Sequence, residues 1–344
     1  MTKVVIGLTD YVIETKNLTK RFGIGPKAVK AVNGIDLEVT GGIHGFLGPN
    51  GAGKSTAIKM LVGAISITSG KAYIKGKRAG SLKAKSYIGY LPEHPKFYHY
   101  SFYKYLVYLG RLGGLSRTRA KNNAMELIEW LELEAAMERD VNAFSAGMKQ
   151  KAGLAQALVH EPELLILDEP TANLDPLGRA NIINQVRSLA DEKELTVLVS
   201  SHILSEIEKL ADEVTIINAG RIILSDNINS LKNLYAGDHF ILDTDHNDNY
   251  YDDFKKTDYI SKMWFDEKER LHLICEDPET LKDDLPDLIR EMDSRLHMFA
   301  KEEVTLEDIF LRVVAESKTG VARSVASHVP LGGGGPAVGG GFNG

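Results

Sequence analysis

Cysteine is almost missing from this chain, because Cys275 is the only one among its 344 residues. A single thiol forms neither an intrachain disulfide nor a multi-cysteine metal site, which fits a reducing compartment such as the cytosol. Long apolar runs are missing too, since no stretch reaches the ~18–20 residues that span a bilayer. The apolar stretch near the start is too short for the core of a signal peptide. We therefore expect a chain that does not enter a membrane by itself.

An excess of positive charge is also absent. The 41 Lys and Arg residues are outnumbered by 47 Asp and Glu, which gives a net charge of -6. A mildly acidic chain is poorly suited to gripping a phosphate backbone over a large surface, so we expect no nucleic-acid partner. Apolar material is plentiful: 43% of the residues are hydrophobic, enough for a sizeable core, and the length suggests two domains.

The apolar patterning predicts two folded regions and a tail. Residues 1–231 hold alternating strand patterns and the continuous apolar runs 164–167 and 196–200, which are typical of parallel strands buried on both faces. Residues 232–318 hold acidic loops, short strands and two helical patterns, so we expect a small α+β domain there. Residues 319–344 are rich in glycine and nearly uncharged, and we expect them to be disordered.

The segment from Gly48 to Thr56 satisfies the phosphate-loop pattern, with a strand pattern before it and a helical stretch after it. Glycines let the backbone wrap closely around phosphates, and the amides of the loop and of the helix start supply donors. We expect Lys54 to neutralise the β- and γ-phosphates and Ser55 to hold Mg2+. The residues expected to contact the nucleotide here are Gly48, Pro49, Asn50, Gly51, Ala52, Gly53, Lys54, Ser55 and Thr56.

A second element is the apolar run 164–167, which ends in Asp168 and Glu169. Sheets of the α/β class place their ligands at the carboxyl ends of strands, so both acids should lie near the phosphates. We expect Asp168 to act on Mg2+ through water, and Glu169 to polarise the attacking water as general base. Two acids after an apolar strand are commonplace alone, but with the phosphate loop they predict a nucleotide-hydrolysing site.

Three further segments stand in an order similar to that of the nucleotide-binding subunits of ABC transporters. Phe144–Gln150 resembles their signature motif, Asn173–Asp175 resembles the D-loop, and Ser201-His202 resembles the switch histidine. The resemblance covers about residues 10–230 and points to the exporter-type, ABC-2-like branch. It implies an α/β P-loop NTPase fold, in which a mixed sheet carries an antiparallel β subdomain and a helical subdomain at about residues 95–160.

The resemblance also implies roles for single residues. Ser145 and Gly147 of the signature would grip the γ-phosphate of ATP bound to the other subunit, and Asp175 would cross the dimer interface. His202 would contact the γ-phosphate as a catalytic residue beside Glu169 and Lys54. Phe22, at the end of a strand pattern, would stack on the adenine. Ser145 also suits a helix N-cap, where its hydroxyl and the following amides form an anion site.

One position departs from the family. Glu93 ends the segment Ile88–Glu93, where the family has a glutamine that touches Mg2+ and links the site to the membrane partner. A carboxylate there would either ligate Mg2+ or serve only the interface with the permease. The segment Thr305–Phe310 looks like the short segment that closes many exporter-type subunits, and an ordinary amphipathic helix explains it equally well.

The resulting prediction is an ATPase that uses ATP and Mg2+ and pairs head to tail with a second copy of itself. It would lie at the cytoplasmic face of the cell membrane, beneath a permease that is a separate polypeptide. The Tyr-rich stretch Phe97–Tyr108 would dock that permease or belong to a self-contained helical core. The main alternative is a soluble ABC ATPase acting on ribosomes or DNA. A small-molecule kinase or GTPase is disfavoured by the signature and by His202.

Overall fold

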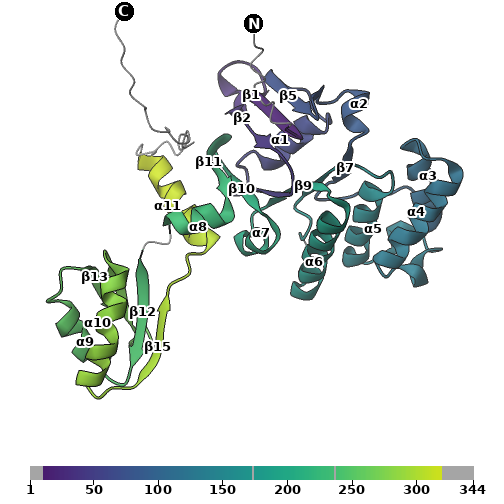
Figure 1. The fold of residues 1–344 in the computed structure, drawn as a ribbon. Helices are drawn as coiled ribbons and strands as arrows, with labels where there is room; N and C mark the ends of the chain where they lie inside the picture. The colour runs from purple at the N-terminus through teal and green to yellow at the C-terminus, as the bar shows by residue number, and fades with distance from the viewer. Residues whose placement is uncertain (1–10, 173, 236–237, 320–344) are drawn as a thin grey trace, which may run out of the picture.

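A computed structural model of the chain describes residues 11–172, 174–235 and 238–319. Within them the chain forms a large α/β unit and a smaller α+β unit that lies to one side of it (Figure 1). The tail for which we predicted disorder lies, from residue 320 on, outside the described residues.

A six-stranded sheet forms the centre of the large unit, in the order β11-β10-β4-β9-β8-β7. The strands from β10 to β7 pair in parallel, and β11 pairs antiparallel with β10. Strands β4, β8 and β9 are buried along their whole length, as expected of parallel strands covered on both faces. The bounds are β4 (Ile43–Leu47), β7 (Ile88–Leu91), β8 (Leu164–Asp168), β9 (Thr196–Ser201), β10 (Glu213–Asn218) and β11 (Arg221–Asn227).

A second, antiparallel sheet has the order β2-β1-β5-β6, with β3 paired to β1. Helix α1 (Lys54–Leu61) shares one core with both sheets, because its buried Ala57 and Ile58 cluster with Ile13 of β1 and Ile166 of β8. The phosphate-loop segment, which precedes α1, is thereby fixed between the two sheets. The remaining bounds are β1 (Ile13–Phe22), β2 (Val29–Ile35), β3 (Glu38–Val39), β5 (Ser69–Ile74), β6 (Lys77–Arg78) and α2 (Leu82–Lys85).

Helices extend the large unit on the side of β7 (Figure 1). Helices α3 and α4 pack closely, since a Cβ added to Gly110 would lie 3.1 Å from the Cβ of Ala120. Helix α5 runs back to the sheet and contacts β7. The helix bounds are α3 (Phe102–Leu112), α4 (Arg117–Trp130), α5 (Ala146–Leu158), α6 (Pro176–Lys193) and α7 (Leu204–Leu210), and short 3-10 turns lie at Gly25–Lys27, Glu134–Ala136 and Val141–Ala143.

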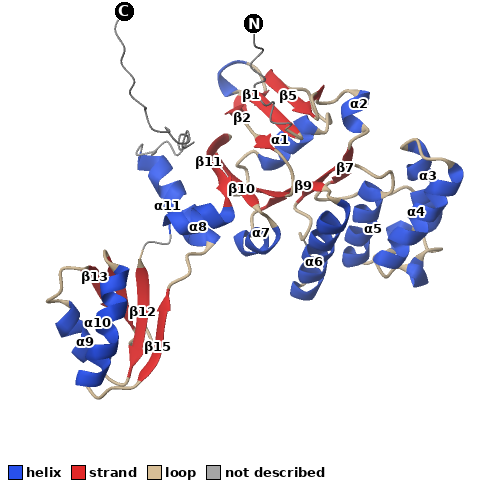
Figure 2. Ribbon diagram, viewed as in Figure 1, coloured by secondary structure: helices blue, strands red, loops and turns tan. Residues whose placement is uncertain are grey.

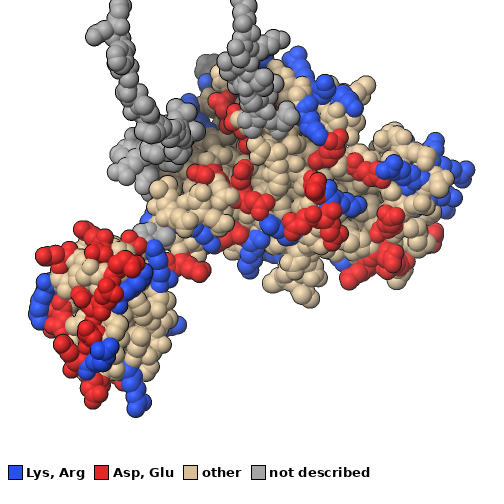
Figure 3. All heavy atoms as spheres, in the orientation of Figure 1, with Lys and Arg blue, Asp and Glu red and all other residues tan. Residues whose placement is uncertain are grey.

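The small unit is a four-stranded antiparallel sheet in the order β13-β14-β12-β15, with the βαββαβ connectivity of ferredoxin-like motifs. Helices α9 and α10 lie over one face of this sheet (Figure 2), and its own core includes Phe240, Leu273 and Leu281. Asp and Glu are plentiful on the face of this unit seen in Figure 3. The bounds are β12 (His239–Thr244), α9 (Asn247–Phe254), β13 (Ile260–Phe265), β14 (Leu271–Cys275), α10 (Pro278–Glu291) and β15 (Leu296–Lys301).

Two helices on either side of the small unit belong to the large one. Helix α8 (Ile228–Tyr235) and helix α11 (Leu306–Thr319) contact each other and β11, and α11 also contacts α7. The apolar stripe of α11, with Leu306, Ile309 and Val313, is buried in the main core of the large unit. The structure therefore divides the range 232–318, which we expected to form one domain, because this stripe at i, i+3 and i+7 is buried against the large unit.

Candidate functional site

The phosphate loop lies between the end of β4 and the start of α1, and its backbone has no room for side chains at two glycines. A Cβ added to Gly48 would lie 2.2 Å from the carbonyl oxygen of Ile217. Gly53 has a φ of +112°, and a Cβ there would lie 2.5 Å from the oxygen of Ala31. Both glycines are therefore required for this tight wrap of the backbone. The buried Lys54 donates a hydrogen bond from Nζ to the oxygen of Gly48 at 2.6 Å.

Asp168 lies at the carboxyl end of β8, where it accepts two hydroxyl hydrogen bonds at one oxygen. Ser55 Oγ donates to Asp168 Oδ1 at 2.9 Å, and Ser200 Oγ donates to the same oxygen at 2.8 Å. Burial raises the pKa of Asp168 above its usual value, and the two hydroxyls act against this shift by hydrogen bonding to the carboxylate. The predicted pair of Ser55 and Asp168 is thus brought into direct contact.

The carboxylate of Glu169 contacts both Lys54 and His202. Its Oε1 lies 3.2 Å from Lys54 Nζ, and its Oε2 lies 2.7 Å from His202 Nδ1. The residue has a φ of +52°, which is unusual for a side chain other than glycine, and it is 7% exposed. Its backbone amide donates to Ser200 Oγ at 3.1 Å, which fixes this strained turn. The three residues that we predicted to be catalytic therefore form one contiguous cluster.

A cavity of about 400 Å³ connects the phosphate loop with Glu169 and His202, whereas Gly48 and Asp168 are not among its lining residues. Glu93, which follows β7, also lines it, so the structure brings the residue that departs from the family to the same cavity. The Glu93 side chain is 47% exposed, and its Oε1 lies 3.7 Å from Nε2 of His94. Burial, with the negative charges of Asp168 and Glu93, raises the pKa of the neighbouring Tyr90 to about 12. The cavity is lined by Ala31, Pro49, Asn50, Gly51, Ala52, Gly53, Lys54, Ser55, Thr56, Glu93, Glu169, Ala172 and His202.

Phe22 is not among the residues that line this cavity. Its ring is 47% exposed at the end of β1, and Lys20 Nζ lies 5.1 Å from the ring centroid. Phe22 pairs with Val29 of β2, the strand that also supplies Ala31 to the cavity wall. The structure thus places Phe22 on the strand pair next to the phosphate cavity, and leaves its role in adenine binding as a prediction.

The signature residues line a second cavity, of about 600 Å³, that shares no lining residue with the first. Ser145 is the N-cap of α5 and accepts a hydrogen bond from the amide of Met148 at 3.3 Å. Asp175 caps α6 by accepting from the amide of Gly178 at 2.9 Å. Gly147 lies on the same wall. Ser145, Gly147 and Asp175 are therefore together, apart from the phosphate loop of their own chain, and Asn173 lies outside the described residues.

Sequence reasoning missed three residues of the phosphate site. Ala31 and Ala172 line the cavity, and no feature of these small apolar residues signals it. Ser200 holds Asp168 and Glu169, and the only signal in the sequence was its place near the carboxyl end of an apolar strand pattern. In the parallel register Ser200 lies directly opposite Asp168.

A phosphate loop after β4, a buried acid at the end of β8 and a mixed sheet define the class of P-loop nucleotide-hydrolysing proteins, and the comparison with known proteins agrees with this class. A family description, "ABC transporter", matches residues 32–172. The relative YxlF of Bacillus subtilis, an uncharacterized ABC transporter ATP-binding protein, is 34% identical over 78% of this chain and 89% of its own. The chain belongs to the family of ABC transporter ATP-binding proteins and is an ATPase of that family.

Other relatives and solved structures support the same conclusion. The bacitracin transport ATP-binding protein BcrA of Bacillus licheniformis is 42% identical over 62% of this chain and 68% of its own. The linearmycin resistance ATP-binding protein LnrL of Bacillus subtilis is 36% identical over 67% and 73%. The structure of cbiO1 from Clostridium perfringens, part of the ABC transporter complex cbiONQ, matches with a TM-score of 0.58 and 26% identity over 64% of this chain and 90% of that one.

A dimeric ATP-binding cassette, MJ0796, bound to ADP and Pi, also has a TM-score of 0.58, at 21% identity over 63% of this chain and 98% of its own. These likenesses confirm the predicted fold class. Among the helices of the described residues, none has the length and apolar character needed to cross a membrane.

Proposed function

We propose that this ABC transporter ATPase works as a head-to-tail dimer, with each ATP held between the phosphate loop of one copy and the signature of the other. This proposal rests on the separation of the two cavities. Ser145 and the phosphate loop of one chain line cavities without a common residue, so a second chain has to supply the missing half of each site. The similar MJ0796 cassette is described as dimeric. Closure on ATP and opening after hydrolysis would then pass motion to a permease.

The residues around the phosphate loop fit ATP with Mg2+. The cavity of about 400 Å³ has the loop amides and Lys54 on one side, which suits anionic phosphates. The carboxylate of Asp168 and the hydroxyl of Ser55 form an oxygen donor set of the kind that Mg2+ prefers. Asp168 is buried, and the hydroxyls of Ser55 and Ser200 donate hydrogen bonds to its Oδ1. Mg2+ supplies charge neutralisation to the phosphates when bound. Phe22, exposed on the adjacent strand pair, is our candidate for stacking on the adenine.

Glu169 is our candidate for the general base and His202 for its partner. With nucleotide present, phosphates would compete with Glu169 for Lys54, which frees one carboxylate oxygen to accept a proton from water. His202 Nδ1 would hold the other oxygen in place through the contact at 2.7 Å. The His202 ring, 46% exposed, is then also able to reach the γ-phosphate.

Two further points concern the membrane partner. Relatives named for bacitracin transport and linearmycin resistance favour an export function, with this chain at the cytoplasmic face beside a separate permease. Helix α3 and the loop before it expose large apolar side chains, and we propose this surface as the permease contact. Its exposed members are Tyr98, Tyr100, Tyr108 and Leu112.

A mixing experiment tests the shared site. Chains with Lys54→Ala lack a working phosphate loop, and chains with Ser145→Arg lack a working signature. Their heterodimer contains one intact composite site, so ATPase activity should return on mixing. The matched control mixes Lys54→Ala with the Lys54→Ala/Ser145→Arg double variant, which restores no site. Equal activity in both mixtures, or full-rate hydrolysis by a monomer at high dilution, would contradict the dimer.

A further inference from the structure

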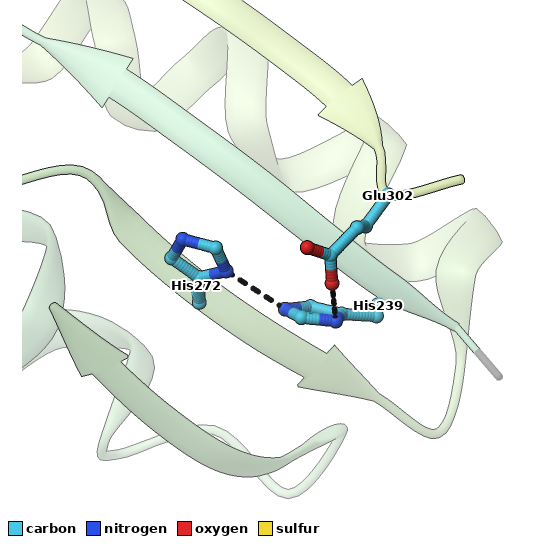
Figure 4. A group of neighbouring side chains, drawn as sticks. All are labelled: His239, His272 and Glu302. Atoms are coloured by element: carbon cyan, nitrogen blue, oxygen red, sulfur yellow. Dashed lines mark hydrogen bonds and ion pairs between the residues drawn. The ribbon is translucent and has the colours of Figure 1, made fainter. Parts of the chain in front are cut away.

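Three side chains with metal-binding atoms meet in the small unit, far from the ATP site in the fold. His239 is the first residue of β12, His272 lies on the neighbouring β14, and Glu302 directly follows β15 (Figure 4). In the antiparallel register β12 lies between β14 and β15, so the sheet itself brings the three residues together. No residue of this cluster lines either of the two cavities described above.

The ligand atoms of these residues converge. His239 Nε2 lies 3.0 Å from His272 Nδ1, and His239 Nδ1 pairs with the carboxylate of Glu302 (Figure 4). One ligand atom from each residue lies within 4.8 Å of the others. Ligands placed ~2.0–2.1 Å from a tetrahedral Zn2+ are separated by roughly 3.4 Å, a spacing that His239 Nε2 and His272 Nδ1 nearly have already. The Glu302 carboxylate needs a movement from the Nδ1 side of the His239 ring toward Nε2. Glu302, with a side chain 39% exposed, has room to make it.

The surroundings of His272 match those of a metal-bound histidine. Its side chain is 8% exposed, and its ring stacks on Trp264 with an interplanar angle of 20°. The second ring nitrogen of His272, Nε2, makes no hydrogen bond, and the carboxylate of Asp266 lies 3.4 Å from it. Arg270 Nε donates a hydrogen bond to Asp266 Oδ2 at 2.7 Å, which holds this carboxylate in place beside the ring. Metal-bound histidines commonly direct their second N–H to such a carboxylate.

We propose that His239, His272 and Glu302 bind a divalent transition-metal ion, with Zn2+ as the best match. Two imidazole nitrogens and one carboxylate oxygen suit Zn2+, whereas Mg2+ and Ca2+ prefer sets made of oxygen alone. His239 Nε2 and His272 Nδ1 face each other at 3.0 Å with one hydrogen-bond proton between them, and a metal ion would take the place of that proton. A water molecule or an external ligand fills the fourth position.

The position of the site suggests what the metal does. The chain passes from α8 to β12 just before His239, and from β15 to α11 just after Glu302. The amide of Glu302 donates to the oxygen of His239 at 2.8 Å, so the two crossings already lie side by side. A metal ion held by both residues and by β14 ties both crossings to the sheet. It would thereby stiffen the connection between the small unit and α11, whose apolar stripe is buried in the core of the ATPase unit.

Direct titration tests the site. Full-length protein without an affinity tag, freed of metal by a chelator and free of nucleotide, is titrated with Zn2+ alone by calorimetry near pH 7.5, where imidazoles are neutral. We expect one Zn2+ per chain with a Kd of about 1 µM or tighter. The His239→Gln/His272→Gln variant should weaken binding at least ~100-fold, and Asp266→Asn should weaken it about 10–100-fold. Co2+ in place of Zn2+ should show the visible absorption of a four-coordinate ion in the wild type and not in the His239→Gln/His272→Gln variant.

The matched control is His297→Gln, which removes an exposed histidine from the same sheet, paired with Asp245, and should leave the affinity unchanged. Basal ATP hydrolysis and circular dichroism report whether each variant is folded, and Glu302→Gln offers a milder change should the double variant unfold. Wild-type protein that binds no Zn2+ would show that the three side chains form only a hydrogen-bonded chain. Equal binding by the ligand variants and the wild type would likewise overturn the proposal.

Discussion

Glu169→Gln is the substitution that separates ATP binding from hydrolysis in this protein. Glutamine keeps the shape of the side chain and removes the negative charge that lies 3.2 Å from Lys54 Nζ and 2.7 Å from His202 Nδ1. In the structure that charge pairs with Lys54, so bound phosphates would have to compete with it. Its removal should therefore leave ATP affinity unchanged or tighter, while the water loses its proton acceptor.

The size of the effect follows from the role of a general base. Loss of the base costs about 10²–10⁴-fold in turnover, equivalent to about 2.7–5.5 kcal/mol in the activation barrier at 1.36 kcal/mol per tenfold. Because hydrolysis opens the dimer in our proposal, the variant should also accumulate as an ATP-bound dimer. Both effects have the same origin, so they should appear together.

Phosphate release measures turnover, and size-exclusion chromatography with ATP measures the dimer. Glu163→Gln is the matched control, because Glu163 directly precedes β8, at the other end of the strand from Glu169, where it forms an exposed ion pair with Lys75. It should hydrolyse ATP at the wild-type rate. Wild-type turnover by Glu169→Gln would refute the reasoning and leave Glu169 as a structural acid. Loss of ATP binding would show instead that the charge holds the phosphate loop together.

Glu93→Gln should raise the Mg2+ concentration needed for half-maximal hydrolysis without changing nucleotide binding, because Glu93 lines the phosphate cavity; an unchanged midpoint in a Mg2+ titration would favour the permease interface. Phe310 of α11 borders a cavity of about 230 Å³ together with His202. Phe310→Ala should therefore lower the free energy of unfolding by about 2 kcal/mol and slow hydrolysis a few-fold. Thermal unfolding and phosphate release measure the two effects, and an unchanged rate would argue against contact with the site. Burial lowers the pKa of His160 below 6.5, although its bond to the oxygen of Ile88 opposes the shift. The stability that comes from neutral His160 is thus present above about pH 6.5 and lost as the pH falls. His160→Gln should therefore flatten the decline of the unfolding temperature between about pH 7 and 5. Equal declines in the variant and the wild type would refute the assignment.

The phosphate site could be predicted because parallel strands bring their carboxyl ends to one edge. Local patterns located the phosphate loop, Asp168 and Glu169, and the family resemblance located His202. In the structure Asp168 contacts Ser55, Glu169 contacts Lys54, and His202 contacts Glu169. The same reasoning did not reach Ser200, since its role depends on which strand lies opposite Asp168. Register is a property of the folded sheet, and single segments carry little information about it.

Two other features lay beyond sequence reasoning for physical reasons. The apolar stripe of α11 indicates that the helix packs on something, but the pattern does not say on which unit, and the structure places it on the larger one. His239 and His272 are 33 residues apart, without the close spacing that marks a metal motif. Only the pairing of β12 with β14 makes them neighbours.

The small unit is an insertion in the chain and not an appendix at its end. The polypeptide leaves the ATPase unit after α8 and returns to it at α11, so a truncation before residue 302 would also remove a helix that completes the ATPase core. The two strands at the boundary, β12 and β15, are antiparallel neighbours with Phe240 opposite Lys301. A short linker between α8 and α11 would therefore close the gap left by excising the whole unit. Such a shortened chain would retain α11 in its place. It is the form of the protein in which the catalytic unit should be studied alone.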